Sequence, residues 1–250
     1  MISMNDQWRI IHGDMMEELT NYKGQVNLII FDSPYNIGKD YGDGEKADRL
    51  PLAQFQSCMD EWVQAAANAL APGGTILLWM CDRHIGVPWN SLEKAGLVWK
   101  QTYKWYISNG CYCENKAGNC TRLIFCYWKK GKPRTFNAEE CQVPSWRALN
   151  NDKRAAANTK NMENWFDVPQ VMPGPPEYIP GLPTQLPLRL VEPLVRTFSN
   201  PGDCAGGAPA GVVAAKAGRR YVGIDRSERY CEIASWRIRN ALIQKKLFPV

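Results

Sequence analysis

The sequence predicts an α/β fold in which a largely parallel sheet carries helices on both faces, and three observations predict it. First, the apolar run over residues 26–30 is too short for a helix and matches a strand buried on both faces. Second, a helical apolar period over 52–70 leads through a Pro-Gly-Gly turn to another apolar run at 75–80. Third, three predicted strands end in an acid, namely Asp14, Asp32 and Asp225. Ligands bind beyond the carboxyl ends of strands in such sheets, so the acids mark a candidate site.

The remaining elements follow as alternating strands and helices. Strands are predicted at 8–12, 26–32, 75–80, 97–107, 122–128 and 220–225. Helices are predicted at 15–19, 52–70, 91–95, 185–198, 210–217 and 226–242. Pro187 suits the first turn of its helix, and Pro193 is expected to kink the same helix. The polar, glycine-rich loop 33–50 follows Asp32, and we expect it to be a mobile lid over the candidate site.

The length of 250 residues fits one domain, 1–250, with an insertion at 108–180 where the sequence becomes rich in Asn, Gly, Pro and Cys. Within the insertion, the turn 129–134 carries four basic residues after an aromatic strand. Basic and aromatic side chains together suit a nucleic-acid backbone and its bases. A solvated hairpin tip explains the same turn equally well. The net charge of +5 is compatible with a polyanionic partner.

The sequence carries nine cysteines, no apolar leader and no apolar run of membrane-spanning length. An odd number of cysteines without a secretory signal favours reduced thiols in the cytoplasm. Four of them cluster, at Cys111, Cys113, Cys120 and Cys126. Their spacing lacks the paired C-x2-C pattern of zinc sites, and Cys126 lies in an apolar run, so we predict no metal site.

A glycine turn at Gly206-Gly207 precedes the helix predicted at 210–217, and the next strand ends at Asp225. A glycine turn lets a ligand approach the backbone, and an acid on the following strand suits the hydroxyl groups of a ribose. This pattern favours a nucleoside-containing cofactor. The alternative is structural, because glycine turns are common before helices, and Asp14 and Asp225 can each cap a helix.

The stretch Asp32-Ser33-Pro34-Tyr35-Asn36 resembles the Asp-Pro-Pro-Tyr motif of the amino-group DNA methyltransferases, which use S-adenosylmethionine. The order of the motifs resembles their permuted β class, in which the catalytic motif precedes the cofactor motif. Further matches are His12-Gly13-Asp14, Trp165–Pro169, Pro183–Leu188, Pro201-Gly202-Asp203 and Gly223-Ile224-Asp225 with Tyr230. The resemblance covers nearly the whole chain. It implies a Rossmann-like methyltransferase sheet with an inserted target-recognition region that reads double-stranded DNA.

The resemblance implies a catalytic site made of Asp32, Ser33, Pro34 and Tyr35. An exocyclic amine is a poor nucleophile because its lone pair is delocalised into the base. The Asp32 carboxylate and the Ser33 carbonyl can accept its hydrogens, and Tyr35 can stack on a base flipped out of the duplex. An acid at the first motif position implies adenine N6 as the target, and cytosine N4 is the alternative.

The resemblance also implies that S-adenosylmethionine is held by Asp14, Gly206, Gly207 and Asp225, with Gln185 nearby. A homodimer is compatible with the family. The sequence departs from the motifs of this family at three places, and two of these departures are single substitutions. Ser33 replaces a proline but keeps its carbonyl, and Leu186 replaces a lysine and removes a charge near the cofactor.

The third departure is a shortened strand, because only Cys204-Ala205 separate Asp203 from the glycine turn. That is too few residues for an ordinary central strand. Residues 198–200 could replace the strand, the sheet could have a gap, or the chain could carry a deletion. A DNA-binding relative without catalytic activity is therefore the competing hypothesis.

Overall fold

The computed structural model describes residues 2–4, 7–42, 44–110, 114–115, 117–174, 177–182, 184–207 and 210–247. Two cysteines of the predicted cluster, Cys111 and Cys113, lie outside these residues. Within them, no group of three or more His, Cys, Asp or Glu side chains could hold a metal ion. Cys126 is fully buried in the core, and burial raises the pKa of its thiol to about 12. The described part of the chain also contains no helix long and apolar enough to cross a membrane.

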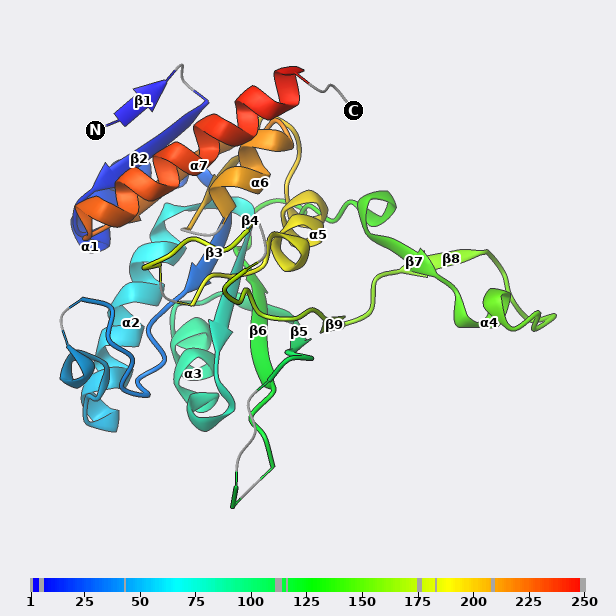
Figure 1. The fold of residues 1–250 in the computed structure, drawn as a ribbon, viewed down its shortest axis with the longest axis horizontal. Helices are drawn as coiled ribbons and strands as arrows, with labels where there is room; N and C mark the ends of the chain where they lie inside the picture. Colours follow the sequence, from blue (N-terminus) through cyan, green and yellow to red (C-terminus); the bar gives the residue numbers. More distant parts are fainter. Residues whose placement is uncertain are drawn as a thin grey trace.

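The described residues form a nine-stranded sheet flanked by helices (Figure 1). In spatial order its strands are β1 (Ile2–Met4), β2 (Trp8–His12), β11 (Arg220–Asp225), β10 (Cys204–Gly206), β3 (Val26–Asp32), β4 (Leu70–Met80), β6 (Thr121–Trp128), β5 (Val98–Tyr106) and β9 (Trp165–Asp167). The five strands from β2 to β4 are parallel. β6 is antiparallel to both β4 and β5. The predicted α/β class with a mainly parallel sheet is confirmed.

Helices cover both faces of the sheet, as predicted. The described helices are α1 (Met15–Glu18), α2 (Leu52–Ala69), α3 (Gly86–Lys94), α4 (Trp146–Leu149), α5 (Leu188–Phe198), α6 (Gly211–Lys216) and α7 (Glu228–Leu247), of which α4 lies away from the sheet (Figure 1). Short 3-10 turns are η1 (Leu19–Tyr22), η2 (Glu45–Asp48), η3 (Asp82–His84) and η4 (Ala138–Cys141). Leu28 and Ile30 of β3 pack in the core formed with α5, α6 and α7, whereas Ile29 packs in the core formed with α2 and α3. This alternation explains why the strand is apolar throughout.

Several predicted boundaries shift because tertiary pairing extends or shortens an element. β4 begins at Leu70, not at 75, because Leu70 already pairs with Val26 of β3. α3 covers 86–94 and is longer than the predicted 91–95. α5 begins at Leu188 with Pro187 as its N-cap, and Pro193 lies inside it.

The strand before the glycine turn is short but present. Ala205 of β10 pairs with Leu28 of β3 on one side and with Tyr221 of β11 on the other. The two alternatives of a gap and of a replacement strand at 198–200 are therefore wrong, since Phe198 is the last residue of α5. Hydrogen bonding from two neighbouring strands makes a three-residue strand sufficient, because its backbone groups are satisfied on both sides.

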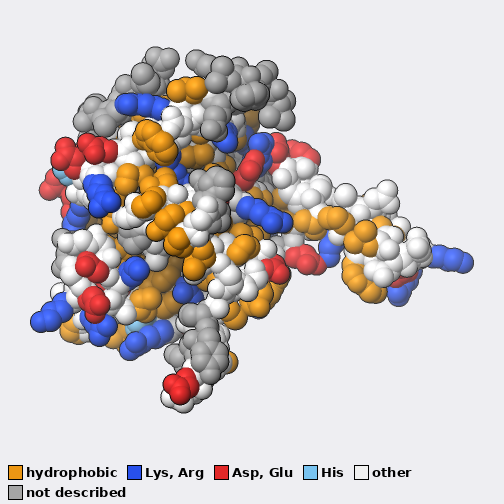
Figure 2. Space-filling model, in the orientation of Figure 1, with side chains coloured by type: hydrophobic (Ala, Val, Ile, Leu, Met, Phe, Trp, Pro, Cys, Tyr) orange, Lys and Arg blue, Asp and Glu red, His pale blue; other side chains and the backbone are white. Residues whose placement is uncertain are grey.

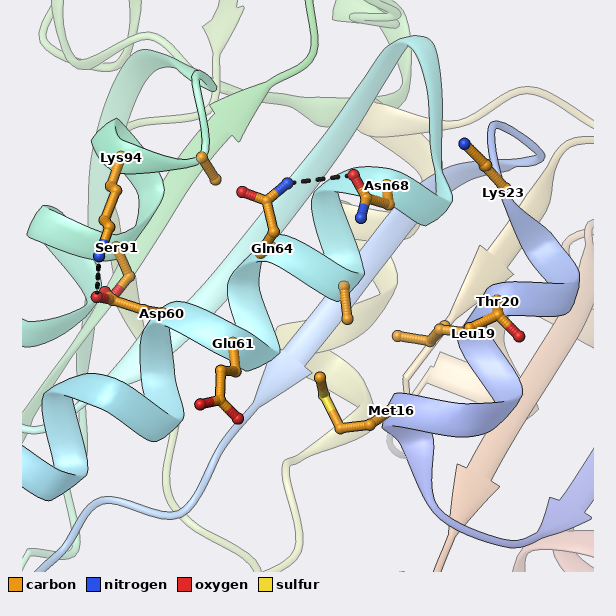
Figure 3. A pocket seen from close by; sticks show the side chains of 12 residues that line it. Met16, Leu19, Thr20, Lys23, Asp60, Glu61, Gln64, Asn68, Ser91 and Lys94 are labelled. Atoms are coloured by element: carbon orange, nitrogen blue, oxygen red, sulfur yellow. Dashed lines mark hydrogen bonds and ion pairs between the residues drawn. The ribbon is translucent and has the colours of Figure 1, made fainter.

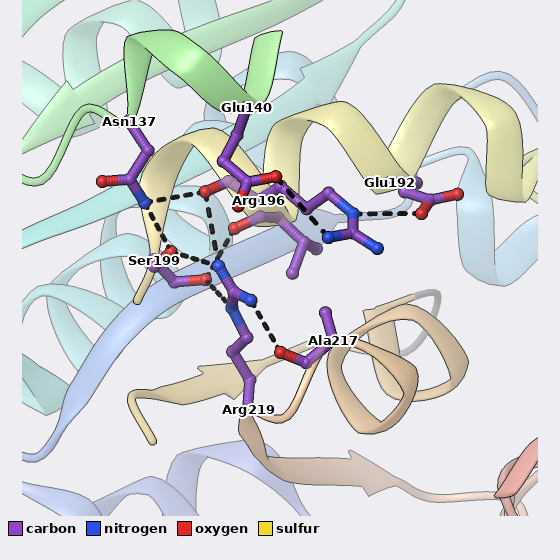
Figure 4. A network of polar contacts seen from close by, with 8 residues as sticks. Asn137, Glu140, Glu192, Arg196, Ser199, Ala217 and Arg219 are labelled. Atoms are coloured by element: carbon purple, nitrogen blue, oxygen red, sulfur yellow. Dashed lines mark hydrogen bonds and ion pairs between the residues drawn. The ribbon is translucent and has the colours of Figure 1, made fainter. Parts of the chain in front are cut away.

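A buried arginine network holds the end of α5, just before this short strand (Figure 4). Arg219 is almost fully buried and donates to the carbonyl oxygens of Ser199 at 2.6 Å and Ala217 at 2.6 Å. Asn137 donates to the carbonyl oxygens of Arg196 and Ser199, both at 2.9 Å. A cation at the C-terminus of a helix satisfies carbonyls that have no partner inside the helix. The network thus fixes where the chain turns from α5 into β10.

The predicted insertion at 108–180 contains two strands of the main sheet. β6 pairs with β4 and β5, and β9 pairs with β5. The part that projects from the body is narrower and is called the arm here, residues 142–161 (Figure 1). The arm consists of the two-stranded sheet β7 (Gln142–Pro144) and β8 (Thr159–Asn161), with α4 at its far end.

Candidate active site

The carboxyl edge of the sheet has a notch where β10 ends. Gly206 of β10 lies opposite Ile29 of β3 and Val222 of β11, and both neighbours continue beyond it to Asp32 and Asp225. The connection from β10 leads through α6 to β11, and that from β3 leads through α2 to β4. α6 and α2 pack on opposite faces of the sheet, so the notch is the switch point at which α/β sheets bind ligands. The topology therefore brings two of the three predicted acids to one place.

Asp32 is the central polar group of this edge. The Tyr35 hydroxyl donates a hydrogen bond of 2.8 Å to Asp32 Oδ1. The guanidinium carbon of Arg122, from β6, lies 5.9 Å from the centroid of the Tyr35 ring. Burial raises the pKa of Asp32 to about 6, against the opposing effects of the Tyr35 hydrogen bond and the Arg122 charge. Asp32 is therefore mostly ionised at pH 7 and can accept hydrogen bonds.

The two residues between Asp32 and Tyr35 shape the turn. Ser33 is buried, and its hydroxyl has no hydrogen-bond partner among the described residues. Pro34 is exposed. The serine that replaces the expected proline thus points a polar atom into the structure at the edge of the site, and its backbone carbonyl remains in place.

The loop after the motif is anchored by two residues that the sequence analysis did not single out as anchors. The buried carboxylate of Asp48 accepts hydrogen bonds from four successive backbone N–H groups, at residues 36–39, over 2.8–3.2 Å. The Asn36 side chain bonds both the N–H and the carbonyl of Leu50, at 2.6 and 2.9 Å. We expected this loop to be a mobile lid. In the structure, buried polar contacts join the beginning of the loop to its end. No sequence signal marks Asp48, because its partners lie about ten positions away and follow no period.

A pocket of about 190 Å³ lies beside the notch. Asp32, Gln185 and Asp225 line it, so the structure brings one predicted catalytic residue together with two predicted cofactor residues. Its other polar or aromatic lining side chains are Tyr41, Thr184, Tyr221, Tyr230 and Arg237. Apolar side chains, including Leu186 and Ile224, complete it. Mixed apolar and polar walls of this kind are typical of small-molecule sites.

Asp225 and Gln185 contribute differently to this pocket. Asp225 Oδ1 accepts from the Ser227 backbone N–H at 2.8 Å, and no described residue bonds its Oδ2. Burial raises the pKa of Asp225. Gln185 Oε1 accepts from the Ile179 N–H at 2.8 Å, so this side chain holds the loop that covers the pocket. Thr184 beside it has a φ of +48°, a strained value for a β-branched residue.

The remaining predicted cofactor residues, Gly206, Gly207 and Asp14, do not line the pocket. Gly207 has a φ of +107°, and a Cβ built on it would lie 1.8 Å from the Ile30 carbonyl oxygen. Glycine is therefore required there, whereas a Cβ atom at Gly206 would meet its neighbours at ordinary contact distances. Asp14 caps α1 by accepting from the Met16 N–H at 2.7 Å and pairs with Arg226. The Met16 hydrogen bond and the Arg226 contact lower the pKa of Asp14.

A second hollow of about 650 Å³ lies between η1, α2 and α3 (Figure 3). None of the predicted site residues lines it. Its polar side chains bond one another: Asp60 with Lys94 at 2.8 Å and with Ser91 at 2.6 Å, and Gln64 with Asn68 at 3.1 Å. The larger hollow is thus separate from the strand-end acids, and the smaller pocket is the candidate active site.

The chemistry of that pocket fits S-adenosylmethionine. The cofactor carries ribose hydroxyls, an ammonium and a sulfonium, all of which suit carboxylate neighbours, and one carboxylate, which suits a cation. The lining of the pocket contains both kinds of group, because Asp32 and Asp225 are acids and Arg237 is a cation. The fold and this pocket define a methyltransferase-like α/β protein.

Comparison with known proteins identifies the family. Residues 26–235 match the family model of the N6/N4 DNA methylases, so the chain belongs to this family of S-adenosylmethionine-dependent DNA methyltransferases. The resemblance predicted from the motifs and the predicted cofactor are confirmed.

Two relatives match over most of their length. The type II methyltransferase M.HpaI of Haemophilus parainfluenzae is 28% identical, covering 92% of this chain and 74% of its own. The DNA adenine methyltransferase YhdJ of Escherichia coli is 28% identical, covering 94% and 83%.

Two solved structures share the fold. The M1.HpyAVI complex with S-adenosylmethionine has a TM-score of 0.67 at 21% identity, covering 92% of this chain and 98% of that one. The cytosine-N4-specific PvuII methyltransferase has a TM-score of 0.71 at 14% identity, covering 92% and 86%.

Proposed function

We propose that this DNA methyltransferase transfers a methyl group to the N6 amine of adenine in double-stranded DNA. The observation that carries the proposal is Asp32, an acid that ends β3 at the notch and lines the pocket. A carboxylate offers the strongest acceptor for the hydrogens of an amine. Cytosine N4 is the second candidate, favoured by the likeness of fold to the PvuII enzyme. The relative YhdJ, named as an adenine enzyme, supports the first.

In the proposed reaction the cofactor supplies an activated methyl group. Asp32 and the Ser33 carbonyl would accept the two hydrogens of the target amine. The nitrogen would then become pyramidal, and its lone pair would be localised on it. The Tyr35 hydroxyl now bonds Asp32 Oδ1. When the base enters, its amine would replace the Tyr35 hydroxyl as the donor to Asp32 Oδ1, and the Tyr35 ring would stack on the base. The bound cofactor would supply the methyl group from its sulfonium, and the target nitrogen would give up one proton to solvent, so that the charges balance.

The cofactor would be held by Asp225, Gly206, Gly207, Asp14 and Gln185. Asp225 Oδ2 would be available for the ribose hydroxyls, and Gly207 would act by letting the turn after β10 pack closely against Ile30 of β3. Gln185 would act through the loop that it holds. Asp14 would act at the rim, once its contact with Arg226 is rearranged.

DNA would be bound by the 108–180 region, and above all by the arm. Trp146 and Leu149 of α4 are 66% and 69% exposed, although both are large apolar side chains. Four cations lie on the arm: Arg147, Lys153, Arg154 and Lys160. Asp152 is the acidic residue of the arm, and it forms ion pairs with Arg147 and Arg154. Figure 2 shows apolar and basic side chains together on this projection. Cations suit phosphates, and exposed aromatic side chains suit bases.

Identification of the methylated nucleoside tests the proposal. The full chain is incubated with S-adenosylmethionine and duplex DNA of mixed sequence, and the DNA is digested to nucleosides for mass spectrometry. N6-methyl-2′-deoxyadenosine is expected. N4-methyl-2′-deoxycytidine would overturn the adenine assignment. Lack of binding of S-adenosylmethionine at millimolar concentration, measured by calorimetry, would favour the inactive DNA-binding relative. The predicted homodimer stays a prediction, which sedimentation of the same sample measures.

A further inference from the structure

Arg237 is a charged side chain in the lining of the candidate cofactor pocket, and the proposed function assigns no contact to it. It lies on α7 and is partly buried, and it lines the pocket with Asp32, Gln185 and Asp225. Among the pocket's lining residues it is the single Lys or Arg.

No described residue neutralises Arg237. The structure records no hydrogen bond or ion pair to its guanidinium from the described part of the chain. The charge of Glu177 opposes the lowering of the pKa of Arg237, but the Glu177 carboxylate accepts the Leu188 N–H at 2.6 Å and forms no recorded ion pair with Arg237. Burial lowers the pKa of Arg237, which reflects lost hydration. A partly desolvated cation without a partner is costly unless a ligand supplies the anion.

The other lining residues of the pocket explain why a cation is needed on α7. Leu186, next to Gln185, is buried and contributes an apolar surface. Asp32 and Asp225 are both acids, so a bound carboxylate would be repelled by them. The neutral and acidic parts of the pocket can hold the adenosine, the sulfonium and the ammonium. The cofactor's carboxylate then has one cationic partner available in the lining.

We propose that Arg237 binds the carboxylate of S-adenosylmethionine, and that this residue on α7 supplies the charge that Leu186 does not. The inference rests on the proposed cofactor site and deepens it by assigning one contact. Guanidinium and carboxylate groups form paired, charge-assisted hydrogen bonds, which are among the stronger polar contacts in proteins.

Binding of two ligands by calorimetry tests this assignment. One ligand is S-adenosylmethionine, and the other is decarboxylated S-adenosylmethionine, which lacks only the carboxylate. The variant Arg237→Gln is expected to weaken binding of the first about 10- to 100-fold and that of the second by no more than about twofold. Arg237→Lys should recover part of the loss. Arg239→Gln, an exposed position on the same helix outside the pocket, is the matched control and should bind both ligands as the wild type does.

The possible failures are distinguishable. Equal weakening of both ligands by Arg237→Gln, or no weakening of either, would overturn the role of Arg237 and leave the cofactor site standing. If the wild type binds neither ligand, the pocket assignment and this inference fall together. If the variant does not fold, the wild type alone decides: it must bind S-adenosylmethionine about 10- to 100-fold more tightly than the decarboxylated form, and equal affinities would overturn the inference.

Discussion

The catalytic segment, residues 32–50, and the arm, residues 142–161, are both irregular and polar, yet they are held in opposite ways. Buried contacts fix the catalytic segment: Asp48 binds four backbone N–H groups, and Asn36 clamps Leu50. The arm depends on a three-residue antiparallel ladder and on ion pairs whose cations are mostly exposed. Chemistry at an amine requires acceptors at fixed positions, whereas a surface that follows DNA can tolerate movement. The contrast leads to four predictions.

The largest effect is expected at Asp32. Asp32→Ala removes the acceptor for the target amine and should lower the rate of methyl transfer at least about 100-fold. The fold should survive, because the change removes a carboxylate whose burial is unfavourable. Single-turnover transfer of labelled methyl groups measures the rate, and thermal melting is the control. Transfer at the wild-type rate would refute the site assignment.

Loss of the Asp48 anchor should destabilise the fold. Asp48→Asn places an amide NH2 group against backbone donors and should reduce the free energy of unfolding by about 1–3 kcal/mol. Asp152→Asn is the matched change in the arm and should have a smaller effect, because the cations that it pairs with are exposed. Urea denaturation followed by circular dichroism compares them. Equal losses would remove the distinction between the two regions.

The pH dependence of methyl transfer should report the ionisation of Asp32. Its pKa of about 6 is raised above the usual 3.8, so the carboxylate gains a proton as pH falls through 6. At saturating cofactor, kcat/KM should rise between pH 5 and 7 and be about tenfold lower at pH 5. The linked effect on stability has the opposite sign. The folded state binds this proton more tightly than the unfolded state, so the contribution of Asp32 to stability falls as pH rises from 3.8 to about 6 and stays at its lower value above that. A profile that is flat between pH 5 and 7 contradicts the assignment.

The smallest effect is expected from the arm. Trp146→Ala should weaken duplex DNA binding about tenfold, because it removes the exposed ring that is proposed to contact bases. Trp236→Ala is the control, since Trp236 is 58% exposed on α7 outside the arm. Fluorescence anisotropy at one salt concentration measures affinity, and cofactor binding should be unchanged in both variants. The DNA-binding role of the arm would be refuted if Trp236→Ala weakened binding as much as Trp146→Ala.

The features near the strand ends were the most predictable part of the molecule. The apolar runs before Asp32 and Asp225 are continuous, and the glycine turn at 206–207 precedes a helix, so local chemistry indicates each one. Asp48 and Arg237 were not predicted as parts of the site. Asp48 acts through backbone groups across a loop, and Arg237 reaches the pocket from the last helix. Neither leaves a periodic or motif signal, since each depends on contacts between segments.

The sequence by itself determined the class of fold, the family and the acids at the strand ends, because alternating apolar runs and turn residues act locally. Only the tertiary structure decided that three residues, 204–206, suffice for a central strand. It also decided that Asp32, Asp225 and Arg237 share one pocket. The physical reason is that strand pairing and side-chain packing join segments far apart in the chain, and their free energy depends on the whole fold.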